Sequence, residues 1–420
     1  MLYRDDLEDL DEVLRRGAVR AVYQPIMDLA TGAPVGYEAL ARGPVGTGLE
    51  RPDALFAAAR AADRLGELDW ACRAAALRGA LDAGMARSLS LFVNIEPEVA
   101  DVEAPPKVLE LLARAERSLS VIIEVTERAL VASPAALLAM VARERARGSG
   151  VAIDDVGADV AALALMPFLQ PDVIKLDLRL VQQRPDAEIV TIVAAVNAQT
   201  ERTGASVLAE GIETAAHVDM ARSFGATLGQ GWALGRPGPL PRGGGREAPR
   251  VVPRSMPAPG PRSTVAAARQ GRQLRRSTKP LLIEMSLLLE RQAEALGRAG
   301  VVLSAFQTAD RFTPATQERY ARLARSSSFV GALGVGLAEE PAPGVRGGHL
   351  TADDPLVDEW AVAIVGPHFA AALAAVDLHD AGPESERRFD YILTYDRNRV
   401  LAVASSLMAR ISGVPVTGPL

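Results

Sequence analysis

Short apolar runs alternate with stretches of helical periodicity along the first 240 residues of the chain. The apolar runs suit buried strands, because they are short and turn-forming residues or polar groups follow them. They fall near residues 19–27, 34–40, 91–95, 120–125, 150–154, 172–176, 206–210 and 226–230. Helical periodicity fills most of the gaps, most clearly at residues 134–147, 187–203 and 215–225. Strands that alternate with helices over this length predict a β/α barrel.

The beginning of the chain departs from this alternation. Residues 2–16 carry a helical pattern, and the two strands that follow are joined only by the turn at Asp28–Pro34. Strands that a short turn connects pair antiparallel, which is unusual in a barrel. A further helical region begins at Pro52 and continues to about Met85, with a break near Gly66. We therefore expect one antiparallel strand in the barrel.

Polar side chains end most of the predicted strands. The run at residues 151–153 leads directly into Asp154 and Asp155, whose mutual repulsion requires a cation or a lysine nearby. The other polar residues at strand ends are Glu38, Asn94, Glu124, Lys175 and Glu210. Because the carboxyl ends of barrel strands meet on one face, we expect these side chains to converge there. Converging carboxylates, an amide and a lysine predict a divalent-metal site with an electrostatic partner.

Each of these residues has a simpler interpretation when it is considered alone. Glu38 or Glu124 could cap a helix or form a salt bridge. Lys175 could be one partner of a buried ion pair, and Asn94 could belong to a turn. The repeated placement at strand ends is what favours the metal site over these alternatives.

The chain changes character after Arg236. Thirteen of the 25 residues at 237–261 are Pro or Gly, a composition that predicts a linker and not a packed core. A basic helical pattern at residues 263–276 follows. Later helices are expected at 281–296, 314–326 and 399–411, with strands at 301–306, 329–337, 359–365 and 389–395. This pattern predicts a second, smaller α/β domain.

Composition and charge restrict the remaining choices. The single cysteine, Cys72, excludes an internal disulfide framework, suits a reducing cytosol and lies in a helical pattern typical of core packing. No window approaches the roughly 18 consecutive apolar residues of a membrane span. The acidic amino terminus lacks the apolar core of a signal peptide. We therefore expect a cytoplasmic protein that has no membrane partner.

The net charge of −6 is unevenly distributed. Residues 236–279 hold eleven Arg or Lys and one acid, a local charge of +10 that leaves −16 for the rest of the chain. A solvated linker explains this basic stretch. Contact with nucleic acid or another acidic surface is the alternative, but aromatic residues do not interleave with the arginines, so a nucleic-acid partner is disfavoured.

Seven motifs in a fixed order carry a family resemblance. They are Tyr37-Glu-Ala-Leu-Ala-Arg42, Phe92-Val-Asn94, Glu124-Val-Thr-Glu127, Asp154-Asp155-Val-Gly157, Ile174-Lys-Leu-Asp177, Ala209-Glu-Gly-Ile-Glu213 and Gln230-Gly-Trp-Ala-Leu-Gly-Arg-Pro237. With these motifs residues 20–240 resemble the EAL-type cyclic-di-GMP phosphodiesterases, named for the tripeptide Glu38-Ala-Leu40. The resemblance implies a modified TIM (β/α)8 barrel with one antiparallel strand. It also implies hydrolysis of cyclic di-GMP to linear pGpG with two Mg²⁺ or Mn²⁺ ions.

The resemblance further assigns a role to each candidate residue. Two ions about 3.5–4 Å apart can activate a water and stabilise the departing oxygen of a phosphodiester. One metal would be held by Glu38, Asn94, Glu124 and Asp154. The second would be held by Asp154 and Asp155, with Glu210 as a ligand or a water-orienting base. Lys175 would stabilise charge on the attacked phosphate, Arg42 would bind a substrate phosphate, and Gln230 would order the site.

The loop after Asp155 departs from the family pattern. The family usually has an aromatic residue, then Gly-Thr-Gly and serines, in a loop that clamps the metals and reaches a dimer interface. Here Val156 replaces the aromatic residue and Gly157-Ala158-Asp159 replaces Gly-Thr-Gly. Glu127, which anchors this loop in the family, loses a hydroxyl partner. We therefore expect a homodimer whose phosphodiesterase activity is weak or regulated.

Two other functions stay open. A catalytically weak or inactive receptor for cyclic di-GMP is the first, and the loop substitutions favour it while the intact metal-binding residues oppose it. An interaction protein that acts only through the basic linker is the second.

The carboxyl-terminal part resembles the DICT sensory domains that accompany cyclic-di-GMP enzymes and two-component proteins. The resemblance lies in Lys279-Pro-Leu-Leu-Ile-Glu-Met-Ser286 and Val302-Leu-Ser-Ala-Phe-Gln307. Neither segment carries a metal-binding or nucleophilic constellation. We expect a barrel domain at residues 1–240, a linker at 241–278 and a sensory domain at 279–420 that regulates the barrel.

Overall fold

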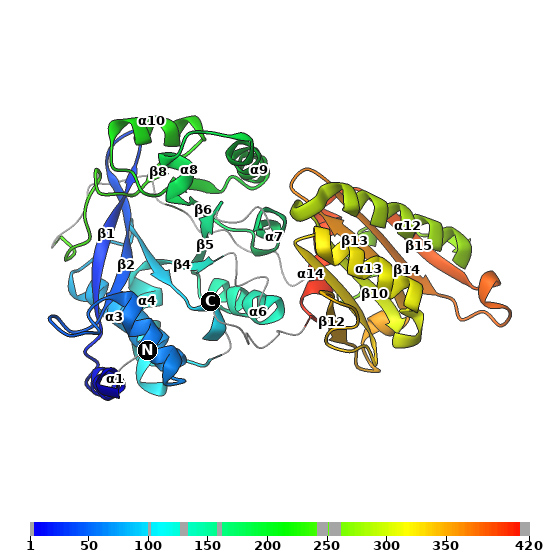
Figure 1. The fold of residues 1–420 in the computed structure, drawn as a ribbon, viewed down its shortest axis with the longest axis horizontal. Coiled ribbons are helices and arrows are strands. Elements are labelled where there is room, and N and C mark those ends of the chain that lie inside the picture. The colour runs from blue at the N-terminus through cyan, green and yellow to red at the C-terminus, as the bar shows by residue number, and fades with distance from the viewer. Residues whose placement is uncertain are drawn as a thin grey trace.

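Two domains make up the protein, and Figure 1 shows them side by side. The computed structural model describes residues 4–99, 102–126, 133–157, 162–241, 251 and 262–411. The amino-terminal domain is a closed barrel, and the carboxyl-terminal domain is a seven-stranded sheet covered by helices. The predicted fold class, a modified barrel followed by a smaller α/β domain, is confirmed.

Eight strands close the barrel in sequence order. They are β1 (Arg20–Asp28), β2 (Pro34–Arg42), β3 (Ser90–Asn94), β4 (Ser120–Thr126), β5 (Gly150–Val156), β6 (Val173–Leu176), β7 (Ser206–Ala209) and β8 (Leu228–Gly229). Strand β1 runs antiparallel to both of its neighbours, β2 and β8, and the other neighbouring pairs are parallel. The expected single antiparallel strand is therefore present.

Helices surround the barrel and begin at predictable residues. They are α1 (Arg4–Arg16), α2 (Pro52–Ala61), α3 (Leu65–Asp82), α4 (Pro106–Ser118), α6 (Pro134–Ala146), α7 (Ala162–Leu169), α8 (Leu178–Gln182), α9 (Ala187–Thr203) and α10 (Ala215–Ser223), with a 3-10 turn η1 (Pro97–Val99). The side chain of Asp186 accepts the Ile189 N–H to start α9, and Gly204 in the left-handed region ends it. Among the described helices of the whole chain, none has both the length and the apolarity to cross a membrane.

The barrel interior explains why the polar residues converge. Side chains alternate between the two faces of a strand, so the residue two positions before an inward-facing residue also points inward. Buried apolar residues occupy these preceding positions and form one cluster: Phe92, Ile122, Ala152, Val173, Leu208 and Leu228. The next inward-facing positions are Asn94, Glu124, Asp154, Lys175, Glu210 and Gln230. A closed apolar layer therefore supports a polar layer at the carboxyl ends of the strands.

The second domain is built on a sheet whose two faces are both covered by helices. Its strands are β9 (Arg275–Thr278), β10 (Val301–Thr308), β11 (Phe329–Val335), β12 (Arg346–His349), β13 (Glu359–Val365), β14 (Ala370–Asp377) and β15 (Arg388–Thr394), in the order β12-β11-β10-β13-β14-β15-β9. Helices α12 (Lys279–Leu296) and α13 (Pro314–Ser326) pack on one face, and α11 (Thr264–Arg269) and α14 (Arg397–Met408) on the other. Short 3-10 turns are η2 (Gly297–Ala299), η3 (Ala309–Arg311), η4 (Pro355–Val357) and η5 (Glu384–Glu386).

Strand β14 is a strand that the hydrophobic pattern did not reveal. Its sequence, Ala-Ala-Ala-Leu-Ala-Ala-Val-Asp, is rich in alanine, which favours helices over strands. It is buried on both faces between β13 and β15, so no polar alternation marks it. Its small side chains let α12 and α14 approach the sheet from opposite sides.

The second domain begins before residue 279, which corrects the expected extent of the linker. Residues 263–276 do not form one helix: α11 covers six of them, and β9 pairs antiparallel with β15. The buried carboxylate of Glu359 accepts the N–H of Thr264 at 2.7 Å and that of Val265 at 3.3 Å, and contacts the Ser263 hydroxyl. The beginning of α11 is thereby fixed to β13.

The two domains meet at helix α7. This helix contacts α14 and the turn η2 of the second domain, and its apolar residues share one buried cluster with α14. Figure 1 shows α7 on the side of the barrel that faces α14. Arg202 of α9 adds a hydrogen bond across the boundary, from its Nη2 to the Pro367 carbonyl at 3.3 Å.

Candidate active site

Lys175 is the centre of the polar layer, and four carboxylates surround it. Its Nζ lies 2.8 Å from Glu124 Oε1, 2.9 Å from Glu210 Oε1, 3.0 Å from Asp154 Oδ1 and 3.8 Å from Glu38 Oε1. The lysine is only 1% exposed. Five strands or strand ends contribute these five side chains, so the expected convergence on one face of the barrel is observed.

Asp154 and Asp155 lie on the same side of the strand because β5 is irregular there. Consecutive side chains of a regular strand point to opposite faces. The pairing of β5 with β6 shifts register between Ile153 and Val156, and Asp155 has a φ of 57°. This left-handed conformation is costly for a residue with a side chain and is typical of functional sites. It brings carboxylate oxygens of Asp154, Asp155 and Glu210 within 4.8 Å of one another.

Amide side chains hold Glu38 in place. Asn94 Nδ2 donates to Glu38 Oε1 at 3.0 Å, and Gln230 Nε2 donates to Glu38 Oε2 at 2.6 Å. Gln230 Nε2 also lies 3.1 Å from Gln24 Oε1. Gln24 stands directly opposite Glu38 in the β1–β2 ladder. The sequence pattern did not single out Gln24, although a polar residue inside an apolar strand was the available signal.

Burial and charge raise the pKa values of three members of this cluster. Burial lowers the pKa of Lys175, but the surrounding carboxylates, Asp154 first, outweigh it and raise that pKa well above its usual value. Burial, together with the charge of Glu38, raises the pKa of Glu124 well above its usual value. Burial also raises the pKa of Glu210 to about 8, against the opposing charge of Lys175.

Glu38 behaves differently from Glu124 and Glu210. Burial raises its pKa, but Lys175 and the hydrogen bonds from Gln230 and Asn94 outweigh burial and lower it. Hydrogen-bond donors and Lys175 therefore keep the Glu38 carboxylate ionised. Glu124 and Glu210 have too little positive charge around them to offset the effect of burial on their pKa values.

The cluster has an excess of negative charge that suits divalent cations. Four carboxylates surround Lys175, and a fifth, that of Asp155, lies beside Asp154 and Glu210. When all five are ionised, the four formal negative charges that Lys175 leaves over equal the charge of two divalent cations. Buried Glu124 pairs with Lys175, and no amide or hydroxyl among the described residues donates a hydrogen bond to its carboxylate. Carboxylate and amide oxygens are the ligands that Mg²⁺ and Mn²⁺ prefer. The donor set thus fits hard divalent cations.

Arg42 lies in the wall of a cavity beside this cluster. The cavity has a volume of about 490 Å³ and is also lined by Asn94, Glu96 and Arg60. Arg42 Nη1 donates to the Ala41 carbonyl at 2.7 Å, and no acidic residue within the described parts of the chain forms an ion pair with it. A cavity with a metal-site residue on one wall and an arginine on another can hold an anionic ligand.

Asp69 and Arg73 of α3 support the loop after Asn94. Arg73 Nη2 lies 2.5 Å from Asp69 Oδ2, and Asp69 Oδ1 accepts the N–H of Glu96 at 2.9 Å. Both side chains are buried. Sequence reasoning missed this pair, because a charged residue within an alanine-rich helix gives no sign that it faces the barrel.

Comparison with known protein families identifies both domains. A family model of the EAL domain matches residues 7–237, which is more than half of the chain. The chain belongs to the EAL domain family. A second family model, the sensory domain in diguanylate cyclases and two-component systems (DICT), matches residues 263–378. The two resemblances expected from the sequence motifs are confirmed.

Curated relatives match about half of the chain. The chain is 31% identical over 240 residues to the cyclic di-GMP phosphodiesterase NbdA of Pseudomonas aeruginosa, covering 56% of this chain and 30% of NbdA. It is 29% identical to the cyclic di-GMP phosphodiesterase RocR of the same organism, covering 55% of this chain and 60% of RocR. An uncharacterized protein of Azorhizobium caulinodans is 31% identical over 241 residues. The chain spans about a third of the length of the first curated relatives that it matches.

Solved structures also match about half of the chain. The PaMucR phosphodiesterase in complex with c-di-GMP is 27% identical, with a TM-score of 0.48, covering 56% of this chain and 98% of that chain. The Klebsiella pneumoniae BlrP1 complex with calcium and cyclic di-GMP is 30% identical, with a TM-score of 0.48, covering 54% of this chain and 57% of that chain.

The loop that departs from the EAL pattern lies partly outside the described residues. Val156 and Gly157 are described, and Gly157 has a φ of 110°. Glu127, Ala158 and Asp159 lie outside the described residues. The expected loss of a partner for Glu127 therefore stays a prediction.

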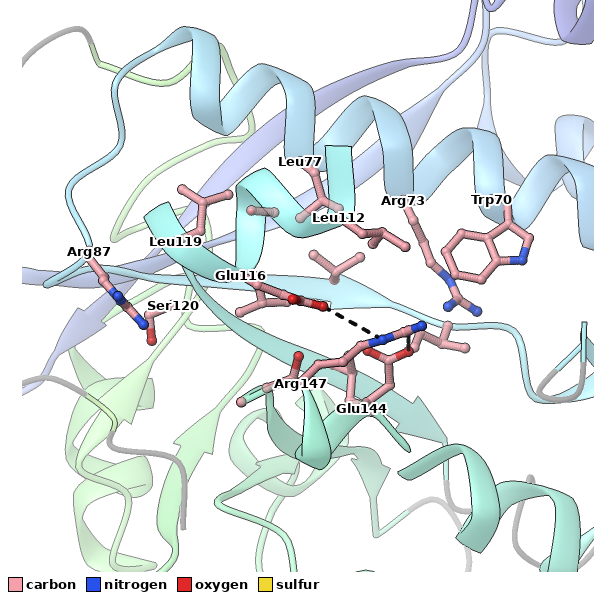
Figure 2. A pocket seen from close by; sticks show the side chains of 17 residues that line it. Trp70, Arg73, Leu77, Arg87, Leu112, Glu116, Leu119, Ser120, Glu144 and Arg147 are labelled. Atoms are coloured by element: carbon pink, nitrogen blue, oxygen red, sulfur yellow. Dashed lines mark hydrogen bonds and ion pairs between the residues drawn. The ribbon is translucent and has the colours of Figure 1, made fainter. Parts of the chain in front are cut away.

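A second cavity of the EAL domain lies on the outside of the barrel wall and contains none of the candidate site residues. Figure 2 shows it between α3, α4 and the end of α6, with Arg147 lying 3.8 Å from Glu116 across it. Its volume is about 80 Å³, enough for a few waters and far below the roughly 300 Å³ of a ligand pocket. This cavity is a packing gap between the helices and the barrel.

Proposed function

We propose that the EAL domain of this chain hydrolyses cyclic di-GMP to linear pGpG. The observation that carries the proposal is the ring of carboxylates around Lys175, whose excess negative charge matches two divalent cations. Family membership and the named activities of relatives such as NbdA support the same reaction.

The candidate residues would be shared between two metal ions, as the resemblance to the family implies. Glu38, Asn94, Glu124 and Asp154 would hold one Mg²⁺ or Mn²⁺, and Asp154, Asp155 and Glu210 the second. When bound, the two ions would supply an activated water and positive charge at the phosphate. Glu210 lies beside Asp154 and Asp155, so it could ligate the second ion or orient the attacking water.

Lys175 acts in this proposal as a fixed positive charge and not as a base. Its carboxylate neighbours raise its pKa well above the usual value, so it stays protonated. A buried ammonium that does not reorient stabilises the charge that develops on the attacked phosphate. Arg42, in the wall of the adjoining cavity, would bind a substrate phosphate. Gln230 would keep the Glu38 carboxylate oriented.

The second domain offers a route for regulation. Helix α7 follows the loop after Asp155 along the chain and packs on α14 of the second domain. A movement of α14 would therefore act on the segment that carries Asp154 and Asp155. We propose that the second domain regulates the barrel site through this contact. The homodimer and the cytoplasmic location expected from the sequence remain predictions. We place the division between the domains after residue 240 and before α11.

A receptor that binds cyclic di-GMP without hydrolysing it is the alternative, and the substituted loop after Asp155 favours it. The test is chromatography of cyclic di-GMP incubated with the full chain and Mn²⁺. We expect pGpG from the wild type, none from Glu38→Ala, and unchanged turnover from Glu110→Ala, a matched exposed residue of α4. If the wild type leaves cyclic di-GMP unconverted but binds it in calorimetry, the chain is a receptor and not a phosphodiesterase.

A further inference from the structure

The second domain contains a cavity that has no part in the barrel site. It lies between α12, α13 and the face of the sheet opposite α14, and its volume is about 370 Å³. This volume falls within the range of about 300–1,000 Å³ that small-molecule sites occupy. Its lining combines a mostly apolar interior with four basic side chains and two acidic ones. The acidic residues are Glu290, which pairs with Arg319, and Asp310, which pairs with Arg311.

Aromatic rings form the interior of this cavity. Phe306, Tyr320, Trp360 and Phe389 all line it. Phe306 and Tyr320 meet edge to face with centroids 5.3 Å apart, and Trp360 and Phe389 do so at 6.0 Å. Rings held in this way present fixed faces and edges, which favour a planar aromatic ligand over a flexible aliphatic one.

Three basic side chains of the cavity lining converge on one carboxylate. Arg311 Nη1 and Arg387 Nη1 lie 2.6 Å and 2.7 Å from Glu384 Oε1, and Lys279 Nζ contacts Glu384 Oε2. Glu384 belongs to the short turn η5, and its side chain is 52% exposed. Arg387 also pairs with Asp377, and Arg311 Nε lies 3.6 Å from Asp310. A carboxylate on an exposed turn thus occupies a position where three cations meet.

A buried polar group of the same cavity lacks a partner. Ser286 of α12 is 6% exposed, and its Oγ has no hydrogen-bond partner among the described residues. A buried hydroxyl that stays unpaired costs about 1–3 kcal/mol in the absence of a ligand or water. Gln307, also in the lining, has a φ of 64°. Both features are typical of a site that is built to meet a polar ligand atom.

We propose that this cavity binds a small planar aromatic carboxylate. The ring lies among Phe306, Trp360 and Phe389, and the carboxylate takes the position of the Glu384 carboxylate beside Lys279, Arg311 and Arg387. Two arginines and a lysine favour a carboxylate because a guanidinium donates two parallel hydrogen bonds to it. Displacement of Glu384 moves η5 away from the cavity, so the ligand changes the conformation of the turn before β15.

The test is calorimetry on the full chain with aromatic acids and their neutral analogues. The probes are indole-3-acetate, 4-hydroxyphenylacetate and 2-naphthoate, each compared with its amide. At least one acid should bind, and roughly tenfold more tightly than its amide, because hydrogen bonds between charged groups are worth that factor or more. Failure of all three acids to bind, or equal binding of each acid and its amide, would overturn the proposal.

Two variants separate a ligand site from a structural ion-pair network. Glu384→Gln removes the competing carboxylate and should tighten the binding of the acid by roughly tenfold, with no effect on the amide. Arg311→Gln should weaken binding of the acid by a similar factor. Arg322→Gln, an exposed arginine of α13 outside the lining, should change neither. Weaker acid binding in Glu384→Gln, with thermal unfolding like that of the wild type, would show that the network is only structural.

Discussion

The barrel site and the cavity of the second domain are built with opposite signs. In the barrel, one lysine stands among four carboxylates; in the second domain, one glutamate stands among three basic side chains. The two central residues differ most in burial, since Lys175 has a side chain that is 1% exposed and Glu384 one that is 52% exposed.

This difference in burial determines what each site can exchange. The ammonium of Lys175 cannot leave the barrel interior without exposing buried carboxylates to each other, so it stays in place. In the function that we propose, divalent cations bind in addition to it. The carboxylate of Glu384 can swing into water at little cost, so a ligand can replace it. A charge held inside a ring of opposite charges is therefore fixed when it is buried and exchangeable when it is exposed.

The largest effect is expected from Lys175→Met. Removing one partner of a buried ion-pair cluster leaves uncompensated charge and costs about 3–5 kcal/mol of unfolding free energy. Urea unfolding in the presence of a chelator measures it. Lys107→Met, at an exposed position of α4, is the matched control and should cost far less. Equal losses in the two variants would show that the cluster around Lys175 is not under electrostatic strain.

Divalent cations should produce the next largest effect. A ligand that binds only the folded state stabilises it by about 2.7 kcal/mol at a concentration one hundred times its dissociation constant. Saturating Mn²⁺ should therefore raise the urea midpoint of the wild type, and Asp155→Asn should lose most of this gain. The account is contradicted if the unfolding midpoint is the same in Mn²⁺ and in chelator.

Glu359 is a buried acid that differs from the carboxylates of the barrel site, because neutral hydrogen-bond donors and not a lysine surround it. It accepts hydrogen bonds from Thr264 and Val265 backbone N–H groups and from two hydroxyls. Glu359→Gln should cost about 2 kcal/mol of unfolding free energy, with no dependence on Mn²⁺. Glu386→Gln, at an exposed position, should be neutral. A loss in Glu359→Gln that Mn²⁺ reverses would mean that the second domain also has a metal-dependent acid.

The smallest effect is expected from Glu384→Gln. Half-exposed ion pairs contribute at most about 1 kcal/mol, so thermal unfolding of this variant should resemble that of the wild type. Set beside Lys175→Met, it isolates burial as the difference between the two sites. If Glu384→Gln destabilised the chain as much as Lys175→Met, the ion pairs of Glu384 would be needed for folding, and burial would not explain the difference between the two sites.

The sequence predicted those parts of the fold that a repeating pattern marks. The ends of the barrel strands were predictable where a polar residue follows an apolar run, as at Glu124 and Lys175. Strand β14 was not, because alanines buried on both faces remove the contrast. The start of the second domain was set too late, since a four-residue edge strand such as β9 carries no periodicity of its own.

The contacts of the site were less predictable than its members. Gln24 and Asp69 act through partners far away along the chain, at Gln230 and Glu96, and nothing local records those pairings. The irregularity that turns Asp155 toward Asp154 depends on the pairing with β6. The three basic side chains around Glu384 likewise come from three separate segments, which only the folded domain brings together.

Equilibrium dialysis of the full chain against Mn²⁺ measures how many cations the excess negative charge of the barrel site holds. We expect two Mn²⁺ per chain in the wild type, fewer in Asp155→Asn, and two in Glu110→Ala, the exposed control. Binding of fewer than one Mn²⁺ per chain, or the same number in Asp155→Asn as in the wild type, would contradict it.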